Sequence, residues 1–260
     1  MVLLALGLCV IVFWIIRRIA HPRKLLLVQS PGRANTIHPL HVFGVFLAWL
    51  LAGRAAYEIL IQHAALETIR ARMVAGPLGQ AVWIGAALLV AATTFRNGLI
   101  RGMGLSLRHW PWDAVRTVVG YLVVFPICLG LADLTRRLMP ADWVHPHPAL
   151  TAMRELGPAW HVLIVVSVIG LAPLAEELFF RGLVQSMLRR YTGRPWAALI
   201  GTSACFASVH VATPHHVPAL FALGIALGYN YERTGRLIAP IGIHTLFNAV
   251  TIIAWYTQVQ

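Results

Sequence analysis

Long apolar runs, separated by short clusters of charged residues, proline and glycine, form the basic pattern of this chain. A membrane-spanning helix needs about 20 mainly apolar residues, whereas a spanning strand needs only about 10. The runs are too long and continuous for barrel strands, so they indicate helices, which satisfy their own backbone polar groups in lipid. The pattern predicts eight helices, over about residues 2–16, 38–62, 79–95, 114–132, 159–188, 196–211, 217–231 and 238–257.

Composition supports the same class. Of the 260 residues, 58% are hydrophobic and only 12% are charged, and the mean hydropathy is +0.72. Soluble globular domains do not normally combine such values. We therefore expect an all-α polytopic membrane protein with its catalytic core in the last four helices, surrounded by the lipid bilayer of a bacterial inner or cell membrane.

The net charge of +12 does not indicate a nucleic-acid partner, because the basic residues lie between the apolar runs instead of forming one basic domain. They concentrate after the first, third, fifth and seventh predicted helices, at Arg17, Arg18, Arg23, Lys24, Arg33, Arg96, Arg101, Arg108, Arg181, Arg189, Arg190, Arg194, Arg233 and Arg236. The positive-inside rule makes these connections cytoplasmic, which predicts extracytoplasmic N- and C-termini. Residues 1–16 lack a preceding basic region and a cleavage site, so we expect them to remain as the first span.

A change in composition divides the chain near residue 158. The segment 139–158 contains four prolines together with His145 and His147, and it is typical of an external loop. Few polar residues interrupt the apolar runs before it, and nearly all of the others come after it. We interpret residues 1–158 as a transmembrane scaffold of about four helices and residues 159–260 as the working part.

Two adjacent carboxylates, Glu176 and Glu177, occur inside the fifth apolar run. A carboxylate at the centre of a membrane helix costs about 2.5–3.5 kcal/mol on insertion scales, so such residues usually serve a function. Glu177 and Arg181 are four residues apart and share a helix face, which predicts an ion pair. Glu176 is rotated by about 100° from Glu177 and faces elsewhere. Pro173 lacks a backbone donor and should loosen the helix beside the two glutamates.

Two later helices carry polar residues at the same four-residue spacing. Phe206 and His210 share one helix face, and so do His244 and Asn248. A single histidine in an apolar helix is more often a packing residue than a catalyst. However, counting about 1.5 Å per residue from the cytoplasmic ends of their helices places Glu176 and His210 at nearly equal depths. We therefore expect these side chains to converge within the membrane, nearer its outer half.

These three motifs, Glu176-Glu177-x-x-x-Arg181, Phe206-x-x-x-His210 and His244-x-x-x-Asn248, resemble those of the CPBP family. The family comprises CAAX prenyl proteases of the Ras-converting type and the bacteriocin-processing or immunity (Abi) proteins. The resemblance covers roughly residues 160–257, and every motif position is filled.

The resemblance implies an intramembrane glutamic endopeptidase that works without a metal, another cofactor or a covalent intermediate. Glu176 and His210 would orient and deprotonate a water, and His244 and Asn248 would donate to the oxyanion. Glu177, Arg181 and Phe206 would support them. The expected partner is a membrane-anchored or lipidated protein or peptide, cleaved near its terminus in CAAX-type or C-terminal sorting reactions.

Three other readings remain open at this stage. A zinc protease would draw its ligands from Glu176, Glu177, His210, His215, His216 and His244, although the chain has no His-Glu-x-x-His motif. A serine protease would use Ser203, in a stretch whose small residues are more typical of helix packing. A non-catalytic binding protein, such as a bacteriocin-immunity partner, would use the same polar residues to hold a ligand.

Overall fold

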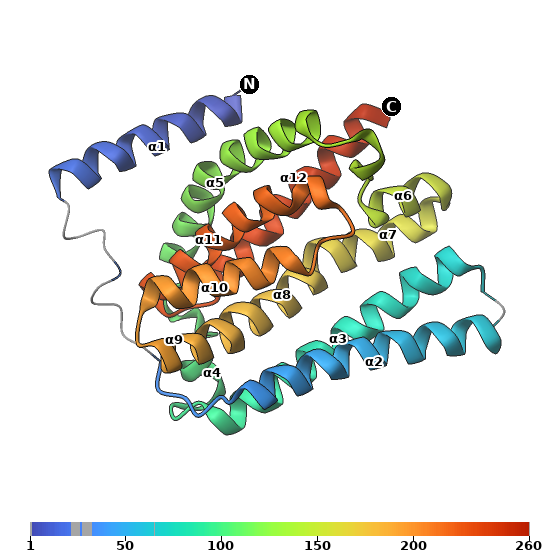
Figure 1. The fold of residues 1–260 in the computed structure, drawn as a ribbon, viewed down its shortest axis with the longest axis horizontal. Helices are drawn as coiled ribbons and strands as arrows, with labels where there is room; N and C mark the ends of the chain where they lie inside the picture. Colours follow the sequence, from blue (N-terminus) through green and yellow to red (C-terminus); the bar gives the residue numbers. More distant parts are fainter. Residues whose placement is uncertain (1, 22–26, 28–32, 65, 260) are drawn as a thin grey trace.

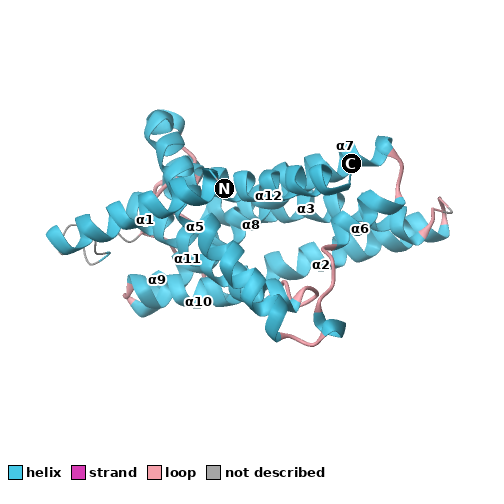
Figure 2. Ribbon diagram, turned by 90° about the horizontal axis from the view of Figure 1, so that it is seen from above, coloured by secondary structure: helices cyan, strands magenta, loops and turns pink. Residues whose placement is uncertain are grey.

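The computed structural model describes residues 2–21, 27, 33–64 and 66–259. Among these residues there are helices and connections but no strand (Figure 2). The α-helices are α1 (Val2–Ala20), α2 (Pro39–Gln62), α3 (Thr68–Thr94), α4 (Gly98–Met103), α5 (Trp110–Leu138), α6 (Pro148–Glu155), α7 (Pro158–Val166), α8 (Ala172–Glu177), α9 (Ser186–Thr192), α10 (Pro195–Ser208), α11 (Val217–Thr234) and α12 (Ile238–Val259). Short 3₁₀ helices cover η3 (Leu107–His109), η4 (Ala141–Trp143) and η7 (Pro214–His216), and π-helices cover η5 (Ser167–Leu171) and η6 (Leu178–Gln185).

The expected all-α membrane fold is confirmed, whereas the expected count of eight spans is not. Among the described residues, five helical stretches are long and apolar enough to cross a membrane: Pro39–Gln62, Thr68–Thr94, Leu107–Leu138, Pro158–Thr192 and Ile238–Thr257. The predicted helix over 196–211 ends earlier, because α10 has 14 residues and stops at Ser208. Two of the basic residues used to predict topology, Arg23 and Lys24, lie outside the described residues.

Several predicted boundaries also move outward. α3 begins at Thr68 instead of residue 79, and α5 covers Trp110–Leu138 instead of 114–132. The extra turns carry arginines such as Arg70 and Arg136. A helix end can extend into the interface because an arginine stem lies along apolar surface while its guanidinium remains in water.

The helices form a bundle in which the late helices surround the long helix Pro158–Thr192. α2 and α3 run side by side as an antiparallel pair on one flank, and α1 packs against α5 on the other (Figure 1). α10, α11 and α12 pack consecutively, and both α11 and α12 contact α5. α1 lies against the middle of α5, where Gly7 approaches Leu122 and Pro126.

The stretch Pro158–Thr192 is one continuous helix with two π-helical segments, which lie on either side of α8. Pro173 cannot donate to the carbonyl oxygen four residues earlier. One residue before this proline, the backbone N–H of Ala172 donates to the carbonyl oxygen of Ser167, five residues back. The widened turns change the rotation of side chains along the helix, and such segments occur often at functional sites.

Aromatic side chains fill the centre of the bundle between α3 and the late helices. The ring centroids of Trp83 and Phe179 are 5.0 Å apart, and those of Phe180 and Phe206 are 5.3 Å apart in an edge-on arrangement. Phe180 and Phe206 are almost completely buried. This packing fixes the helix that carries the glutamates against α3 and α10.

Candidate active site

Glu177 and Arg181 form an ion pair in the core of the bundle. Arg181 Nη1 donates to Glu177 Oε1 at 2.6 Å, and both side chains are fully buried. Arg181 Nη2 donates to the carbonyl oxygen of Gly224 at 3.3 Å, and its guanidinium carbon lies 4.6 Å from the centre of the Phe206 ring. The pair predicted from the four-residue spacing is therefore present, and it also joins the glutamate helix to α10 and α11.

His244 of α12 lies between the two glutamates. Its Nδ1 is 3.0 Å from Glu177 Oε1, and its Nε2 is 3.8 Å from Glu176 Oε2. Because a carboxylate can only accept a hydrogen bond, Nδ1 carries the proton in the contact with Glu177. This histidine therefore presents its other ring nitrogen to Glu176.

Glu176 is the more accessible of the two carboxylates. Its side chain is 16% exposed, while that of Glu177 is fully buried. Glu176 Oε2 is itself buried and has no hydrogen-bond partner among the described residues. A buried carboxylate oxygen without a partner is costly, and such an atom commonly marks a site that binds water or a ligand.

His210 lies two residues beyond the end of α10, in a turn, and not within the predicted helix. Its Nδ1 donates to the carbonyl oxygen of Phe206 at 2.8 Å, which leaves Nε2 as an acceptor in the neutral ring. The described residues show no direct hydrogen bond between His210 and Glu176. Phe206 lies close to both histidines, because its ring centre is 5.0 Å from that of His210 and 5.7 Å from that of His244.

Asn248 lies one turn after His244 on α12. Its amide nitrogen donates to the carbonyl oxygen of Val168, in the π-helical segment η5, at 2.8 Å. Ser167 of the same segment donates to the side-chain oxygen of Gln80 in α3 at 3.0 Å. These two contacts hold the widened turn between α3 and α12, and the second amide hydrogen of Asn248 remains for another acceptor.

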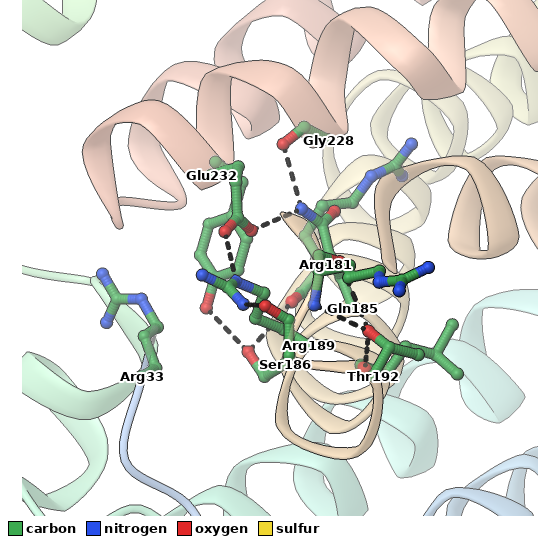
Figure 3. Close-up of polar contacts among 12 residues, drawn as sticks. Arg33, Arg181, Gln185, Ser186, Arg189, Thr192, Gly228 and Glu232 are labelled. Carbon is green, nitrogen blue, oxygen red and sulfur yellow. Dashed lines mark hydrogen bonds and ion pairs between the residues drawn. The ribbon is translucent and has the colours of Figure 1, made fainter. Parts of the chain in front are cut away.

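A polar network continues from Arg181 along the same helix and was missed in the sequence. Gln185, four residues later, is fully buried and donates to the carbonyl oxygen of Gly228 at 3.0 Å and to Glu232 Oε2 at 3.2 Å (Figure 3). Arg189 donates to the other oxygen of Glu232 at 2.9 Å. The four-residue spacing of positions 177, 181, 185 and 189 is the sequence signal that would have revealed this stripe.

The segment between α5 and α7 comes near His210. The side chain of His147 accepts from the backbone N–H of Ala149 at the start of α6, and His210 is close enough to affect it electrostatically. Desolvation, and secondarily His210, lowers the pKa of His147. Desolvation followed by the proximity of His215 and His147 lowers the pKa of His216 to about 4. These histidines are therefore neutral at pH 7.

The residues required by the other readings have defined contacts. Ser203 is buried, its hydroxyl donates to the carbonyl oxygen of Leu199 at 2.8 Å, and it packs against Gly224. The rings of His215 and His216 are 3.9 Å apart. In the part of the chain that the structure describes, no three His, Cys, Asp or Glu side chains are grouped so that they could hold a metal ion.

Known proteins are similar to this chain mainly over its late helices. Residues 158–250 match the family model described as type II CAAX prenyl endopeptidase, Rce1-like. Over 92 residues the chain is 34% identical to YdiL of Bacillus subtilis (strain 168), which carries a provisional name as a membrane peptidase; the match covers 35% of this chain and 36% of that protein. Over 151 residues it is 27% identical to an uncharacterized 24.3 kDa protein of Escherichia coli, covering 56% of this chain and 62% of that one. No solved structure matches the chain.

The resemblance to the CPBP family is thus confirmed for the segment that contains all three motifs. The matches span between about a third and three fifths of these curated relatives. The matched segment is similar to membrane proteases, and its apolar helices are those of an integral membrane protein.

Proposed function

We propose, from the similarity of residues 158–250 to type II CAAX prenyl endopeptidases and from the contacts of the two glutamates, that this protein is an intramembrane glutamic endopeptidase. Residues 159–260 would form the catalytic core, and residues 1–158 a transmembrane scaffold. The observation that carries the proposal is the position of His244, which binds Glu177 through Nδ1 and faces Glu176 through Nε2. Glu176 then retains a buried oxygen without a hydrogen-bond partner among the described residues, able to accept a proton from a water.

Glu176 is the general base in this mechanism. Its carboxylate removes a proton from a water, and the resulting hydroxide forms a bond to the carbonyl carbon of the scissile peptide. The carbonyl electron pair moves to the oxygen. When the tetrahedral intermediate collapses, the C–N bond breaks and the leaving amine takes the proton from Glu176. The neutral Nε2 of His210 accepts the second hydrogen of the water and orients it, a role that follows from the hydrogen bond of its Nδ1 to Phe206.

His244 and Asn248 stabilise the oxyanion. With a hydrogen on each ring nitrogen, His244 would contact Glu177 through Nδ1 and donate from Nε2 to the developing oxygen charge. The second amide hydrogen of Asn248 would donate to the same oxygen. Donors of this kind, fixed before the reaction, lower the barrier by about 3–4 kcal/mol each.

A metal-independent reaction agrees with the position of Arg181. Its buried guanidinium already neutralises Glu177 at 2.6 Å, so a divalent cation beside the same carboxylate would be repelled. The zinc reading makes a different prediction, because chelation would abolish activity and added zinc would restore it. We expect activity to persist after chelation.

The apolar helices around the site support a substrate held at the membrane. We infer that it is a membrane-anchored or lipidated protein cleaved near its terminus, as the similarity to CAAX prenyl endopeptidases suggests. The basic residues between alternate apolar runs support extracytoplasmic termini in a bacterial membrane.

The proposal is tested by quantitative proteomics of membrane-protein termini in cells that express the native protein, Glu176→Ala or the control Glu67→Gln. Glu67 is an acidic residue at the start of α3, outside the site. We expect specific termini to be lost with Glu176→Ala and kept with Glu67→Gln. If no terminus changes, and a Glu176→Gln variant keeps the biological effect, the protein is a binding or immunity protein instead.

A further inference from the structure

A groove of about 400 Å³ lies between α2 and α3. Its lining includes Trp49, Gly53, Arg54 and Tyr57 of α2 together with Arg72 and Gly76 of α3, and it contains none of the candidate catalytic residues. Both helices are candidate membrane spans, so the groove opens from a surface that faces lipid. It is therefore a separate feature that the peptidase mechanism does not use.

Glycine residues create the groove. A Cβ atom on Gly79 would lie 3.2 Å from the Cα atom of Gly53, which shows how closely the two helices approach there. By contrast, Cβ atoms on Gly53 and Gly76 would meet no atom within 4 Å. α2 and α3 therefore approach closely at Gly79, and the space beside Gly53 and Gly76 on the same pair of helices is open.

Two arginines lie at this groove within candidate membrane spans. The Arg54 side chain is 72% exposed and pairs with Glu58, which also accepts a hydrogen bond from Gln62. Arg72 is exposed and has no ion pair or hydrogen bond among the described residues. The two guanidinium groups and one carboxylate leave a net positive charge on a lipid-facing surface. A guanidinium near the end of a span can reach the headgroup region while its stem lies along apolar surface, so this charge is available to a lipid headgroup.

The charged and the apolar residues of the groove lie at different distances from the helix ends. At about 1.5 Å per residue, Arg72 lies about 6 Å from the start of α3 at Thr68, and Arg54 about 12 Å from the end of α2 at Gln62. Trp49 lies about 20 Å from the same end, at the deep end of the groove. The cationic groups are therefore near the membrane boundary, and the aromatic and glycine surface extends towards its centre.

We propose that this groove binds a glycerophospholipid with an anionic headgroup, with its phosphate against Arg54 and Arg72 and one acyl chain along Trp49 and Gly76. The phosphate is the acceptor that guanidinium groups bind in a bidentate manner. The pair with Glu58 holds Arg54 at the groove, and Arg72 supplies the uncompensated charge. This lipid site is independent of the proposed peptidase activity.

The test uses the purified full-length protein in a neutral detergent and follows thermal unfolding during titration with phosphatidylglycerol, phosphatidylcholine or inorganic phosphate. A ligand that binds only the folded state raises the unfolding temperature in a saturable way. We expect such a rise with phosphatidylglycerol and a much smaller one with phosphatidylcholine. Arg54→Gln and Arg72→Gln should each weaken the apparent affinity about fivefold, as expected for one basic group at a membrane surface.

Matched variants separate this site from a general attraction of anionic lipid. Arg70→Gln removes a half-buried arginine of α3 that pairs with Glu67 outside the groove, and it should bind phosphatidylglycerol like the native protein. Gly76→Leu fills the groove without changing a charge, whereas Gly85→Leu adds the same side chain to open space elsewhere on α3. We expect Gly76→Leu to abolish the lipid-dependent rise and Gly85→Leu to keep it.

Three results would overturn the proposal. Equal rises with phosphatidylglycerol and phosphatidylcholine would show that the headgroup charge is not recognised. An unchanged response in Gly76→Leu would place the lipid elsewhere. A comparable rise with inorganic phosphate would show that the arginines bind a free anion and that the apolar groove contributes nothing.

Discussion

Replacing Arg181 with methionine tests the buried ion pair most sharply. Methionine fills much of the same volume but leaves Glu177 with only His244 as a partner, and it removes the donor to Gly224 and the cation beside the Phe206 ring. Breaking a buried pair by removing one partner costs about 3–5 kcal/mol, because the remaining charge stays desolvated. We therefore expect a large loss of stability from this single change.

The loss can be measured as a shift in the thermal unfolding midpoint. In a chain of this size about 1 kcal/mol corresponds to roughly 2–4 °C, so Arg181→Met should lower the midpoint by about 6–20 °C. Adding Glu177→Gln removes the stranded charge, so the double variant should recover most of the stability. The exposed pair of Arg137 with Asp133 has the same four-residue spacing, and Arg137→Met should cost no more than about 1 kcal/mol.

Similar, small decreases of the unfolding midpoint in Arg181→Met and Arg137→Met would contradict a desolvated Glu177 carboxylate. A double variant less stable than Arg181→Met alone would contradict it as well. Either result would mean that the Glu177 carboxylate is not held desolvated by its surroundings.

Two further predictions concern Asn248 of α12 and His216 of η7. Asn248→Leu should lower the free energy of unfolding by about 1 kcal/mol, because the hydrogen bond to Val168 is lost. It should also lower kcat about 10²–10³-fold with little change in KM, because the oxyanion forms only in the transition state. An unchanged kcat in a purified cleavage assay would remove Asn248 from the mechanism. The lowered pKa of His216, about 4, means that the unfolded chain takes up a proton that the folded protein excludes as the pH falls from about 6.5 towards 4. Stability should therefore decrease through this pH range, and His216→Gln should flatten the dependence of the unfolding midpoint on pH; an identical profile in that variant would contradict the assignment.

The sequence predicts the features that depend on one helix at a time. The apolar runs predict the all-helical membrane fold, and the four-residue spacing predicts the pair of Glu177 with Arg181. The number of spans was less predictable, because α10 has only 14 residues and packs one face against α9, η6 and α11 while its other face is exposed. An apolar run does not by itself show where the helix inside it ends.

Features that depend on two helices were harder to predict. The expected pairing of Glu176 with His210 assumed a uniform helical rise per residue. However, two π-helical segments flank α8 and change the directions of its side chains, and α10 ends before His210. The contact of His244 with both glutamates depends on how α12 is rotated against α8, which no spacing within one helix reveals. The buried Gln185 was missed although it continues the stripe of Glu177 and Arg181 by one further step of four residues.

In the proposed mechanism, Glu176 activates a water for peptide hydrolysis while Glu177 supports His244. The decisive measurement is the rate at which purified Glu176→Gln cleaves a peptide that contains a terminus identified in cells. The native protein is measured beside it, and both assays contain a chelator. We expect the native protein to cleave the peptide in the presence of the chelator. Glu176→Gln should cleave it at least about 10³-fold more slowly, which is the range expected for loss of a general base in a preorganised site. The unfolding midpoint of Glu176→Gln should equal that of the native protein. A rate for Glu176→Gln within about tenfold of the native rate would contradict this mechanism.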